Sequence, residues 1–307
     1  MKDVPVSMNG ERIRGANGLE IFVRSWRPEG APRAVVAICH GVNSHGGYYG
    51  WAAAQLVESG LAVYALDLHG RGQSDGERFY IENIEEYVAD VDALINLART
   101  REPSLPTFLL GHSAGGVISC MYALEHQEKL AGLICESFAF QAAAPDIALS
   151  VVKGLARIAP HTRVPHLKNV EFSRDPAVVR AMNADPLIDK EMPPIKTVSE
   201  LVRAADRLRR EFPLIKLPVL ILHGTADRLS RPAGSQLFYD TVGSTDKTLK
   251  LYDGHVHDLL NDYGREQVMA DMNTWLSARL PAVRAHATLP LGVVTPTVDL
   301  SIPTSRR

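Results

Sequence analysis

A serine between two glycines, in residues 111–115 (Gly-His-Ser-Ala-Gly), has the surroundings of a nucleophile. The apolar run 106–110 before it predicts a buried strand, and residues 114–126 after it predict a helix with small residues on its inner side. At such a strand-to-helix turn the backbone is tight enough to lift the serine hydroxyl out of the sheet. Side chains two residues away would collide with the turn, which explains the glycines. Ser113 is therefore the predicted nucleophile.

A serine nucleophile needs a base, and chain position selects it from eleven histidines. In the order serine, acid, histidine, the base follows the last strand of the sheet. His255, His257 and His286 lie beyond the predicted strand 217–222, and His286 belongs to a tail rich in proline. His257 opens a helical turn that would fix its ring over the sheet edge. It is the preferred base, and His255 is the alternative.

The base in turn needs a carboxylate that orients it, and two residues at strand ends qualify. Asp227 follows the predicted strand 217–222, where an aspartate is also common simply because it stabilises turns. Glu136 ends an earlier strand, from which its carboxylate could reach the base or hydrogen-bond an inserted segment. Asp227 is the preferred acid and Glu136 its rival.

An oxyanion hole for acyl transfer requires two backbone N–H groups aimed at one oxygen. Ala114, directly after the nucleophile, is expected to supply the first. The loop after residue 39 is expected to supply the second from Val42, because Gly41 lets the backbone turn there. His40 is expected to brace this loop. His45 either supports the site or is an ordinary loop histidine.

The elements that must position these groups alternate along the chain, which predicts an α/β fold with a mostly parallel sheet and helices on both faces. Together with the serine turn at 111–115, this arrangement resembles the α/β-hydrolase fold. Two strands open the chain, at 11–14 and 19–26. The later strands are predicted at 34–39, 62–66, 106–110, 130–135, 217–222 and 247–252, and the helices at 50–59, 83–99, 114–126 and 265–280.

The alternation stops in the middle of the chain, which divides it into four parts. Residues 1–140 and 214–280 are the two parts of the core, and 141–213 is predicted to be an inserted helical cap with many prolines. Asp175 and Asp185, each followed by proline, are predicted to begin cap helices. Residues 281–307 are predicted to be an extended or disordered tail.

One predicted cap helix has an apolar face formed by Ile147, Val151, Leu155 and Ile158. This face either packs on the body of the protein or forms an entrance wall for an acyl chain. In the second interpretation it makes transient contact with a membrane or micelle surface.

Composition limits the partners and the compartment. The chain has 307 residues, 46% of them hydrophobic, and a net charge of −2, so nothing favours a nucleic-acid partner. No metal or cofactor is implied, and the oligomeric state is left open. No signal peptide or transmembrane helix is evident, and the three cysteines favour a cytoplasmic protein with reduced thiols, at most peripheral to a membrane. These cysteines are Cys39, Cys120 and Cys135.

From about residue 11 to 280 the chain resembles the monoacylglycerol lipase and lysophospholipase-like branch of the α/β-hydrolases. The motifs that carry the resemblance are His-Gly-X-X-X-His at 40–45 with Tyr48 or Tyr49, Asp-Leu-His-Gly-Arg-Gly-Gln-Ser at 67–74, Gly-His-Ser-Ala-Gly-Gly at 111–116, His-Gly-Thr-Ala-Asp at 223–227 and His-Asp-Leu-Leu-Asn-Asp at 257–262. The cap sequences 172–176 and 183–187 are also similar. The resemblance implies a triad of Ser113, Asp227 and His257 and an oxyanion hole at Val42 and Ala114.

Three departures from the family lie near the expected acyl pocket. Ala114 stands where the family often has methionine, and residues 43–44 (Asn-Ser) replace its usual Gly-Glu. Residues 136–138 (Glu-Ser-Phe) stand where small residues and proline are common. These changes bear on the substrate and leave the chemistry intact. The residues expected to contact the substrate or support the site are His40, Gly41, His45, His112, Glu136 and Phe138.

The sequence thus predicts a serine ester hydrolase that acts, through an acyl-enzyme, on small esters with an apolar acyl group. The alternatives are an esterase for another small ester or thioester, such as a lysophospholipid or an aryl or alkyl ester, and a non-catalytic ligand-binding member of the fold. The turn 67–74 is predicted to be structural, with Asp67, Arg71 and Ser74 bracing one another.

Overall fold

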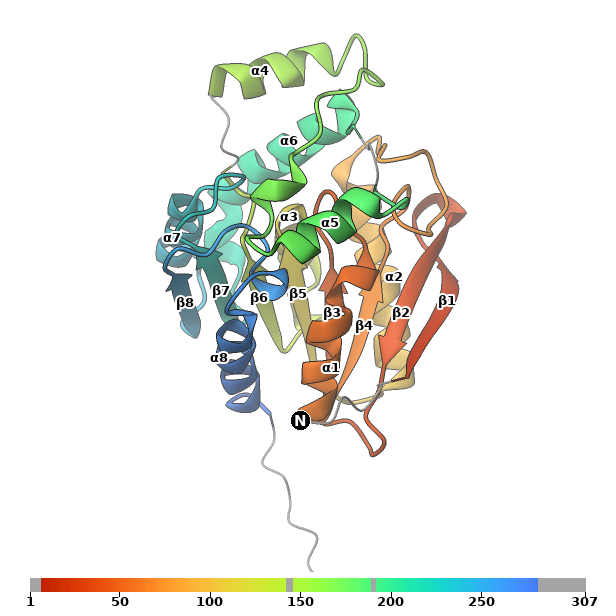
Figure 1. Ribbon diagram of the computed structural model, residues 1–307, viewed down its shortest axis with the longest axis vertical. Helices are drawn as coiled ribbons and strands as arrows, with labels where there is room; N and C mark the ends of the chain where they lie inside the picture. Colours follow the sequence, from red (N-terminus) through yellow and green to blue (C-terminus); the bar gives the residue numbers. More distant parts are fainter. Residues whose placement is uncertain (1–6, 142–145, 189–191, 281–307) are drawn as a thin grey trace, which may run out of the picture.

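A computed structural model describes residues 7–141, 146–188 and 192–280. Its centre is one eight-stranded sheet in the order β1-β2-β4-β3-β5-β6-β7-β8, in which the pairs β1–β2 and β2–β4 are antiparallel and the other neighbouring pairs are parallel (Figure 1). The strands are β1 (Met8–Arg14), β2 (Glu20–Trp26), β3 (Ala34–Cys39), β4 (Leu61–Leu66), β5 (Thr107–His112), β6 (Gly132–Glu136), β7 (Val219–Gly224) and β8 (Lys247–Tyr252).

Helices cover both faces of this sheet, as the alternating pattern predicts. Alternate residues of β3 belong to two different cores: Val35 and Ala37 pack with α2 (Ile84–Arg101) and α3 (Ala114–His126). Val36 and Ile38 pack with α1 (Gly50–Glu58) and α8 (Arg265–Ser277). Because both faces are covered, all the residues of β3 to β7 are buried, which is why these strands read as continuous apolar runs.

One helix of the core was not predicted from the sequence. It is α7 (Pro232–Thr241), which follows β7 and buries Phe238 in the same core as α3. The short 3-10 helices are Ala16–Gly18, Gly46–Tyr49, Gln127–Lys129, Asn169–Glu171, Phe212–Leu214 and Leu259–Asn261.

The segment between β6 and β7 lies over the carboxyl ends of the parallel strands (Figure 1). It contains α4 (Asp146–Leu155), α5 (Pro176–Ala184) and α6 (Ile195–Glu211). Asp175 caps the start of α5 as predicted, since its carboxylate accepts from Ala177 N at 2.8 Å. The prediction for Asp185 is wrong: it ends α5, and its carboxylate accepts from Leu187 N in a turn.

The predictions for the cysteines, for membrane-spanning helices and for the tail can be compared with the described residues. Cys39, Cys120 and Cys135 are free and buried. Within residues 7–141, 146–188 and 192–280, no helix has the length and apolar character needed to cross a membrane. The predicted tail, 281–307, lies outside the described residues.

Candidate active site

Ser113 stands at the turn between β5 and α3 in a backbone conformation that few L-residues adopt, with φ 54° and ψ −119°. The two flanking glycines make this turn possible. A Cβ on Gly111 would lie 2.5 Å from the backbone oxygen of Gly115, and a Cβ on Gly115 would lie 2.2 Å from that of Cys39. The backbone N–H of Ser113 donates to Glu136 O at 2.9 Å, which ties the turn to β6.

The structure brings the predicted nucleophile, base and acid together in one hydrogen-bonded row. His257 Nε2 lies 2.8 Å from Ser113 Oγ, and His257 Nδ1 lies 2.8 Å from Asp227 Oδ2. The three side chains come from loops after β5, β7 and β8, at the same edge of the sheet. His255, the alternative base, has its ring against Tyr252 instead. The geometry is that of a serine, a base that can take its proton and a carboxylate that orients the base.

Asp227 is held by more groups than the base alone. Its Oδ1 accepts from the backbone N–H of Leu229 and of Ser230, at 2.8 and 3.1 Å. Its Oδ2 lies 3.0 Å from His223 Nε2 and 2.8 Å from Ser230 Oγ. Burial alone would raise the pKa of Asp227, but hydrogen bonds from His223 and His257 outweigh burial and lower it. Asp227 is therefore ionised at neutral pH.

The loop after β3 passes directly over the nucleophile. A Cβ on Gly41 would lie 2.8 Å from the Cβ of Ser113, so this approach requires glycine. Val42 and Ala114 share the lining of a narrow, mostly apolar cavity with a volume of about 10 Å³. The cap closes one side of this cavity with Leu201 of α6. The remaining lining residues are His40, Gly41, Leu68, Arg71, Phe79, Tyr87 and Ile118.

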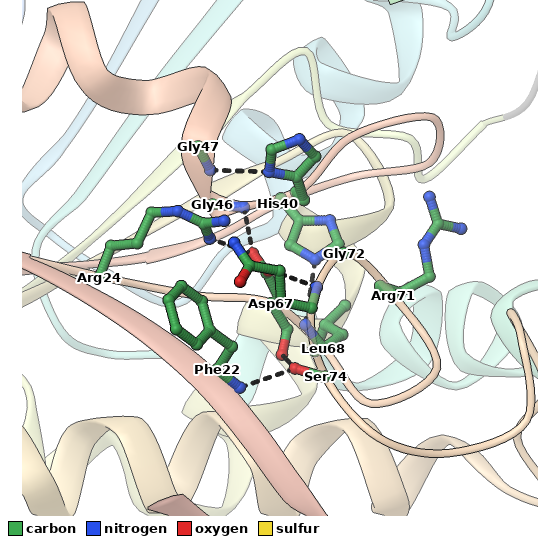
Figure 2. Close-up of polar contacts among 12 residues, drawn as sticks. Phe22, Arg24, His40, Gly46, Gly47, Asp67, Leu68, Arg71, Gly72 and Ser74 are labelled. Carbon is green, nitrogen blue, oxygen red and sulfur yellow. Dashed lines mark hydrogen bonds and ion pairs between the residues drawn. The ribbon is translucent and has the colours of Figure 1, made fainter. Parts of the chain in front are cut away.

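The turn 67–74 holds this loop in place (Figure 2). His40 Nδ1 lies 2.8 Å from Gly41 O, and His40 Nε2 accepts from Leu68 N at 3.1 Å. Burial and the nearby Arg71 lower the pKa of His40 to about 3, so the ring is neutral and Nδ1–H donates. Asp67 accepts from Gly46 N at 2.7 Å. His40 is thus a brace for the loop, as predicted.

Within the same turn, the bracing differs in part from the prediction. Ser74 Oγ donates to Asp67 O at 2.6 Å, as expected. The carboxylate of Asp67 pairs with Arg24 of β2 (Figure 2). The Arg71 guanidinium donates to Ser44 O and lies over the Phe79 ring. The turn is therefore fastened to β2 and to the loop after β3.

The cap contacts the loop after β3 at two points. Asn43 Nδ2 donates to Leu167 O at 2.9 Å, and His45 Nε2 lies 2.9 Å from Asp185 Oδ2. Tyr48 OH donates to the same Asp185 oxygen at 3.0 Å. His45 therefore acts as a link to the cap and does not touch the proposed triad through any hydrogen bond among the described residues.

A third contact covers the base itself. The Phe172 ring of the cap packs edge-on against the His257 ring, and Phe172 O accepts from Asp258 N at 2.8 Å. Arg174 forms an ion pair of 2.8 Å with Asp262. The cap and the loop that carries His257 are thus joined by an aromatic contact, a backbone hydrogen bond and an ion pair.

Glu136 is not the carboxylate that meets the base. It is fully buried below the base, and its Oε1 accepts from Leu260 N at 3.3 Å. Burial and the neighbouring Asp258 raise the pKa of Glu136 well above its usual range. Glu136 therefore supports the loop that carries His257, and no hydrogen bond among the described residues joins its side chain to the base or to the cap.

His112, Glu136 and Asp258 are the described residues that could together hold a metal ion, since one ligand atom of each lies within 4.8 Å of the others. The His112 ring lies 5.1 Å from that of His257, and burial lowers the pKa of His112. Burial also raises the pKa of Asp258 to about 6. Burial thus opposes the negative charges that Glu136 and Asp258 would carry as a pair of metal ligands.

Phe138 was expected at the acyl site, and the structure corrects this. Ser137 has a φ of 45°, and this left-handed turn directs Phe138 into the core, where it is fully buried. Its ring packs against those of Phe140, Phe212 and Phe238, with centroids 5.2 to 6.1 Å away. Phe138 therefore supports the fold behind α3 and does not line the cavity beside Ala114.

Sequence reasoning missed three side chains that contact the proposed triad: those of Phe172, His223 and Ser230. His223 stands in the motif His-Gly-Thr-Ala-Asp, and the spacing of four residues to Asp227 was a usable signal. Phe172 precedes the cap sequence Ser-Arg-Asp-Pro, but nothing local shows that it covers a histidine far along the chain.

Comparisons with known proteins show the family to which the chain belongs. Residues 30–264 match the family described as "Serine aminopeptidase, S33". The chain is 33% identical over 268 residues to the monoacylglycerol lipase of Mycolicibacterium smegmatis, covering 87% of this chain and 96% of that protein. It is 34% identical over 269 residues to the monoglyceride lipase of Homo sapiens, covering 86% and 89%.

A solved structure of a monoacylglycerol lipase has a similar fold. The monoacylglycerol lipase of Paleococcus ferrophilus superposes with a TM-score of 0.77 at 29% identity, covering 85% of this chain and 99% of that one. The chain therefore belongs to the α/β-hydrolase family described as "Serine aminopeptidase, S33", and it is a serine hydrolase of the lipase and esterase class.

Proposed function

We propose that the protein hydrolyses monoacylglycerols or similar small esters with one apolar acyl chain. The observation that carries the proposal is the row Ser113–His257–Asp227, with both contacts at 2.8 Å. Ser113 Oγ attacks the ester carbonyl while His257 Nε2 takes its proton. The ester C–O bond then breaks, and the alcohol leaves with that proton. Water, activated by His257, attacks the acyl-enzyme, releases the carboxylic acid and restores the serine.

The oxyanion formed at each step needs two donors, and the backbone N–H groups of Val42 and Ala114 are proposed for this role. Gly41 lies against Ser113, which places the next residue beside the nucleophile. The fixed loop reduces the reorganisation needed when the charge develops, because His40 and Asp67 hold it from below.

The apolar cavity beside these donors supports an apolar acyl group as the part of the substrate that is recognised. Val42, Ala114 and Leu201 contribute apolar walls, and Arg71 is the one charged residue among the described residues of the lining. The named relatives from Mycolicibacterium smegmatis and Homo sapiens are monoacylglycerol and monoglyceride lipases, which favours a glycerol ester over other small esters. Ala114 leaves room at the nucleophile for the first carbons of the chain.

Two measurements test this function. A fluorophosphonate probe should label wild-type protein at Ser113 and leave Ser113→Ala unlabelled. A panel of monoacylglycerols and p-nitrophenyl esters of increasing chain length should then show the highest kcat/KM on monoacylglycerols. Labelling without any ester turnover would point to a non-catalytic member of the fold, and a clear preference for thioesters or lysophospholipids would replace the glycerol ester.

We also propose that the outer part of the cap contacts the surface of a micelle or membrane that holds the substrate. Val151 and Leu155 of α4 are 54% and 46% exposed, and Ile158 beyond it is 84% exposed. Three large apolar side chains so close together favour a lipid surface over packing on the body. The double variant Val151→Ser with Leu155→Ser should lose binding to lipid vesicles, while Leu251→Ser on the distant strand β8 should bind as wild type. Unchanged vesicle binding by the double variant would contradict the proposal.

A further inference from the structure

The acid of the proposed triad has a second histidine on the oxygen that faces the base. Asp227 Oδ2 lies 2.8 Å from His257 Nδ1 and 3.0 Å from His223 Nε2. His223 is in β7, four residues before Asp227, and its side chain is completely buried. The carboxylate is therefore held between two imidazole rings.

The orientation of hydrogen bonds at His223 follows from its two neighbours. An ionised carboxylate only accepts hydrogen bonds, so His223 Nε2 must carry a hydrogen and donate it to Asp227. Ser235 Oγ, in the first turn of α7, lies 2.7 Å from His223 Nδ1. In the neutral ring Nδ1 is then an acceptor, and the Ser235 hydroxyl donates to it. Ser235 thus selects the tautomer of His223 that can serve Asp227.

The other contacts of Asp227 show which of its oxygens His223 controls. Two backbone N–H groups, those of Leu229 and Ser230, hold Oδ1. Ser230 Oγ lies 2.8 Å from Oδ2 but also 3.1 Å from Ser137 O, and its single proton serves one of them at a time. Apart from His257 itself, His223 is therefore the donor that stays on Oδ2.

We propose that His223 is a positioning residue that holds Oδ2 of Asp227 toward His257 and takes up part of its negative charge, with Ser235 fixing the His223 tautomer. This inference rests on the proposed function, in which His257 is the base and Asp227 the acid. It extends the row to Ser113–His257–Asp227–His223–Ser235. The lowered pKa of Asp227 agrees with it, because the hydrogen bond from His223 is among the causes.

Removing the hydrogen-bond donor of His223 should change the pH dependence of catalysis. Without His223, Oδ2 carries more charge and attracts the proton shared by Asp227 and His257 more strongly. The acid limb of the pH profile should therefore move to higher pH. Other titratable groups that face the pair are His112, Glu136 and Asp258, and they stay the same throughout the series.

The test compares His223→Leu, His223→Gln and Ser235→Ala with wild type. The Gln side chain carries an amide N–H that can reach Asp227, whereas Leu offers no donor. We would measure kcat and KM on one soluble p-nitrophenyl ester, and the rate of fluorophosphonate inactivation, across the pH range in which histidine titrates, with Tm as a check on folding.

His223→Leu should lower kcat by about 10- to 100-fold, the usual effect of one hydrogen bond to a charged group, with little change in KM. Its acid limb should shift to higher pH in both assays. His223→Gln should recover most of the kcat. The kcat of Ser235→Ala should lie between those of His223→Gln and His223→Leu, because without Ser235 the His223 ring can adopt the other tautomer.

Two results would overturn the inference: a Gln variant no better than Leu, or a loss of kcat in Leu without movement of the acid limb. If His223→Leu does not fold, Ser235→Ala decides, and an unchanged acid limb in that variant overturns the inference. Failure of the proposed function is a separate result, because it is seen in the wild-type protein itself, either as absent fluorophosphonate labelling or as labelling without turnover of the proposed esters.

Discussion

The ring of Phe172 stands edge-on against the ring of His257, with 5.2 Å between the two centroids. Phe172 is 1% exposed, and its backbone oxygen accepts from the residue after the base. One short stretch of the cap therefore keeps water from one side of the imidazole and also fixes the loop that carries it.

Shortening this ring should loosen the base. Phe172→Ala should lower kcat on a soluble ester by up to about 100-fold, because a small displacement of a catalytic group is costly. Phe172→Leu, which keeps apolar cover, should lose much less. Val170→Ala, at an exposed position of the same segment, serves as the control. Equal kcat values for Phe172→Ala and wild type would show that the aromatic contact does not position His257.

Substitution of Ser113 or of His257 should reduce kcat to a similar extent. Ser113→Ala and His257→Ala should each lower kcat by at least about three orders of magnitude with the fold intact, since such residues act as a unit. His255→Ala should cost much less, because its ring lies against Tyr252. Steady-state kinetics together with circular dichroism would check this. A larger loss for His255→Ala in a folded protein would move the base to that residue.

The two rival carboxylates should respond very differently to removal of charge. Asp227→Asn should reduce turnover by several orders of magnitude, since the amide neither fixes the tautomer of His257 nor stabilises the imidazolium. Glu136→Gln should leave turnover close to wild type, because Glu136 binds Leu260 N with an oxygen that Gln retains. The kcat values on one soluble ester decide the matter, and the opposite ranking would assign the acid to Glu136.

Glu136 should also give stability a recognisable dependence on pH. Its pKa is raised in the folded protein, so above the usual value of 4.5 the folded protein keeps a proton that the unfolded chain has lost. The free energy of unfolding from this group is therefore highest below that value and falls as the pH rises through the raised pKa. Asp258, with its pKa raised to about 6, acts with the same sign.

Glu136→Gln removes this titration, so its stability relative to wild type should increase from about pH 5 to pH 8. Urea unfolding of both proteins at the two pH values measures the difference. Titrating groups outside the pair of Glu136 and Asp258 are common to both proteins and cancel. A difference that stays constant with pH would show that Glu136 does not hold its proton in the folded protein.

The cavity beside Ala114 should set a dependence on acyl chain length. Each methylene buried in an apolar wall contributes about 0.8 kcal/mol, or up to about fourfold in kcat/KM, until the space is full. Ala114→Met should move the optimum to shorter chains, because the larger side chain enters the cavity. Phe138→Leu should reduce stability without moving the optimum, since Phe138 lies in the core. A flat profile, unchanged in Ala114→Met, would contradict this assignment of the cavity.

Much of the fold could be predicted because burial on both faces leaves a strong pattern. The strands Ala34–Cys39 and Lys247–Tyr252 and the helix Ala114–His126 were predicted to the residue. The helix Pro232–Thr241 was missed because it contains glycine and serine and few periodic apolar residues. Its place is decided by Phe238, which enters a core made by distant parts of the chain.

The candidate site also has a part that could be predicted from the sequence and a part that could not. The positions of Ser113, Asp227 and His257 follow from strand ends, which parallel sheets bring to one edge. The direction of Phe138 depends on the left-handed turn at Ser137, and no sequence pattern indicates that turn. The bond from Ser235 to His223 depends on tertiary packing of β7 against α7. Local rules place the elements, whereas side-chain partners across elements require the three-dimensional structure.

The attachment of the cap has a consequence for how such an enzyme can change its specificity. Leu167, Phe172, Arg174 and Asp185 are bound to the two loops that carry the proposed oxyanion donor and the base, whereas Val151 and Leu155 of α4 are exposed. Mutations in the outer helix are therefore free to accumulate without disturbing the reaction centre. The anchored half constrains catalysis, and the outer half is the part in which natural variation or directed evolution can adapt the enzyme to a new lipid environment.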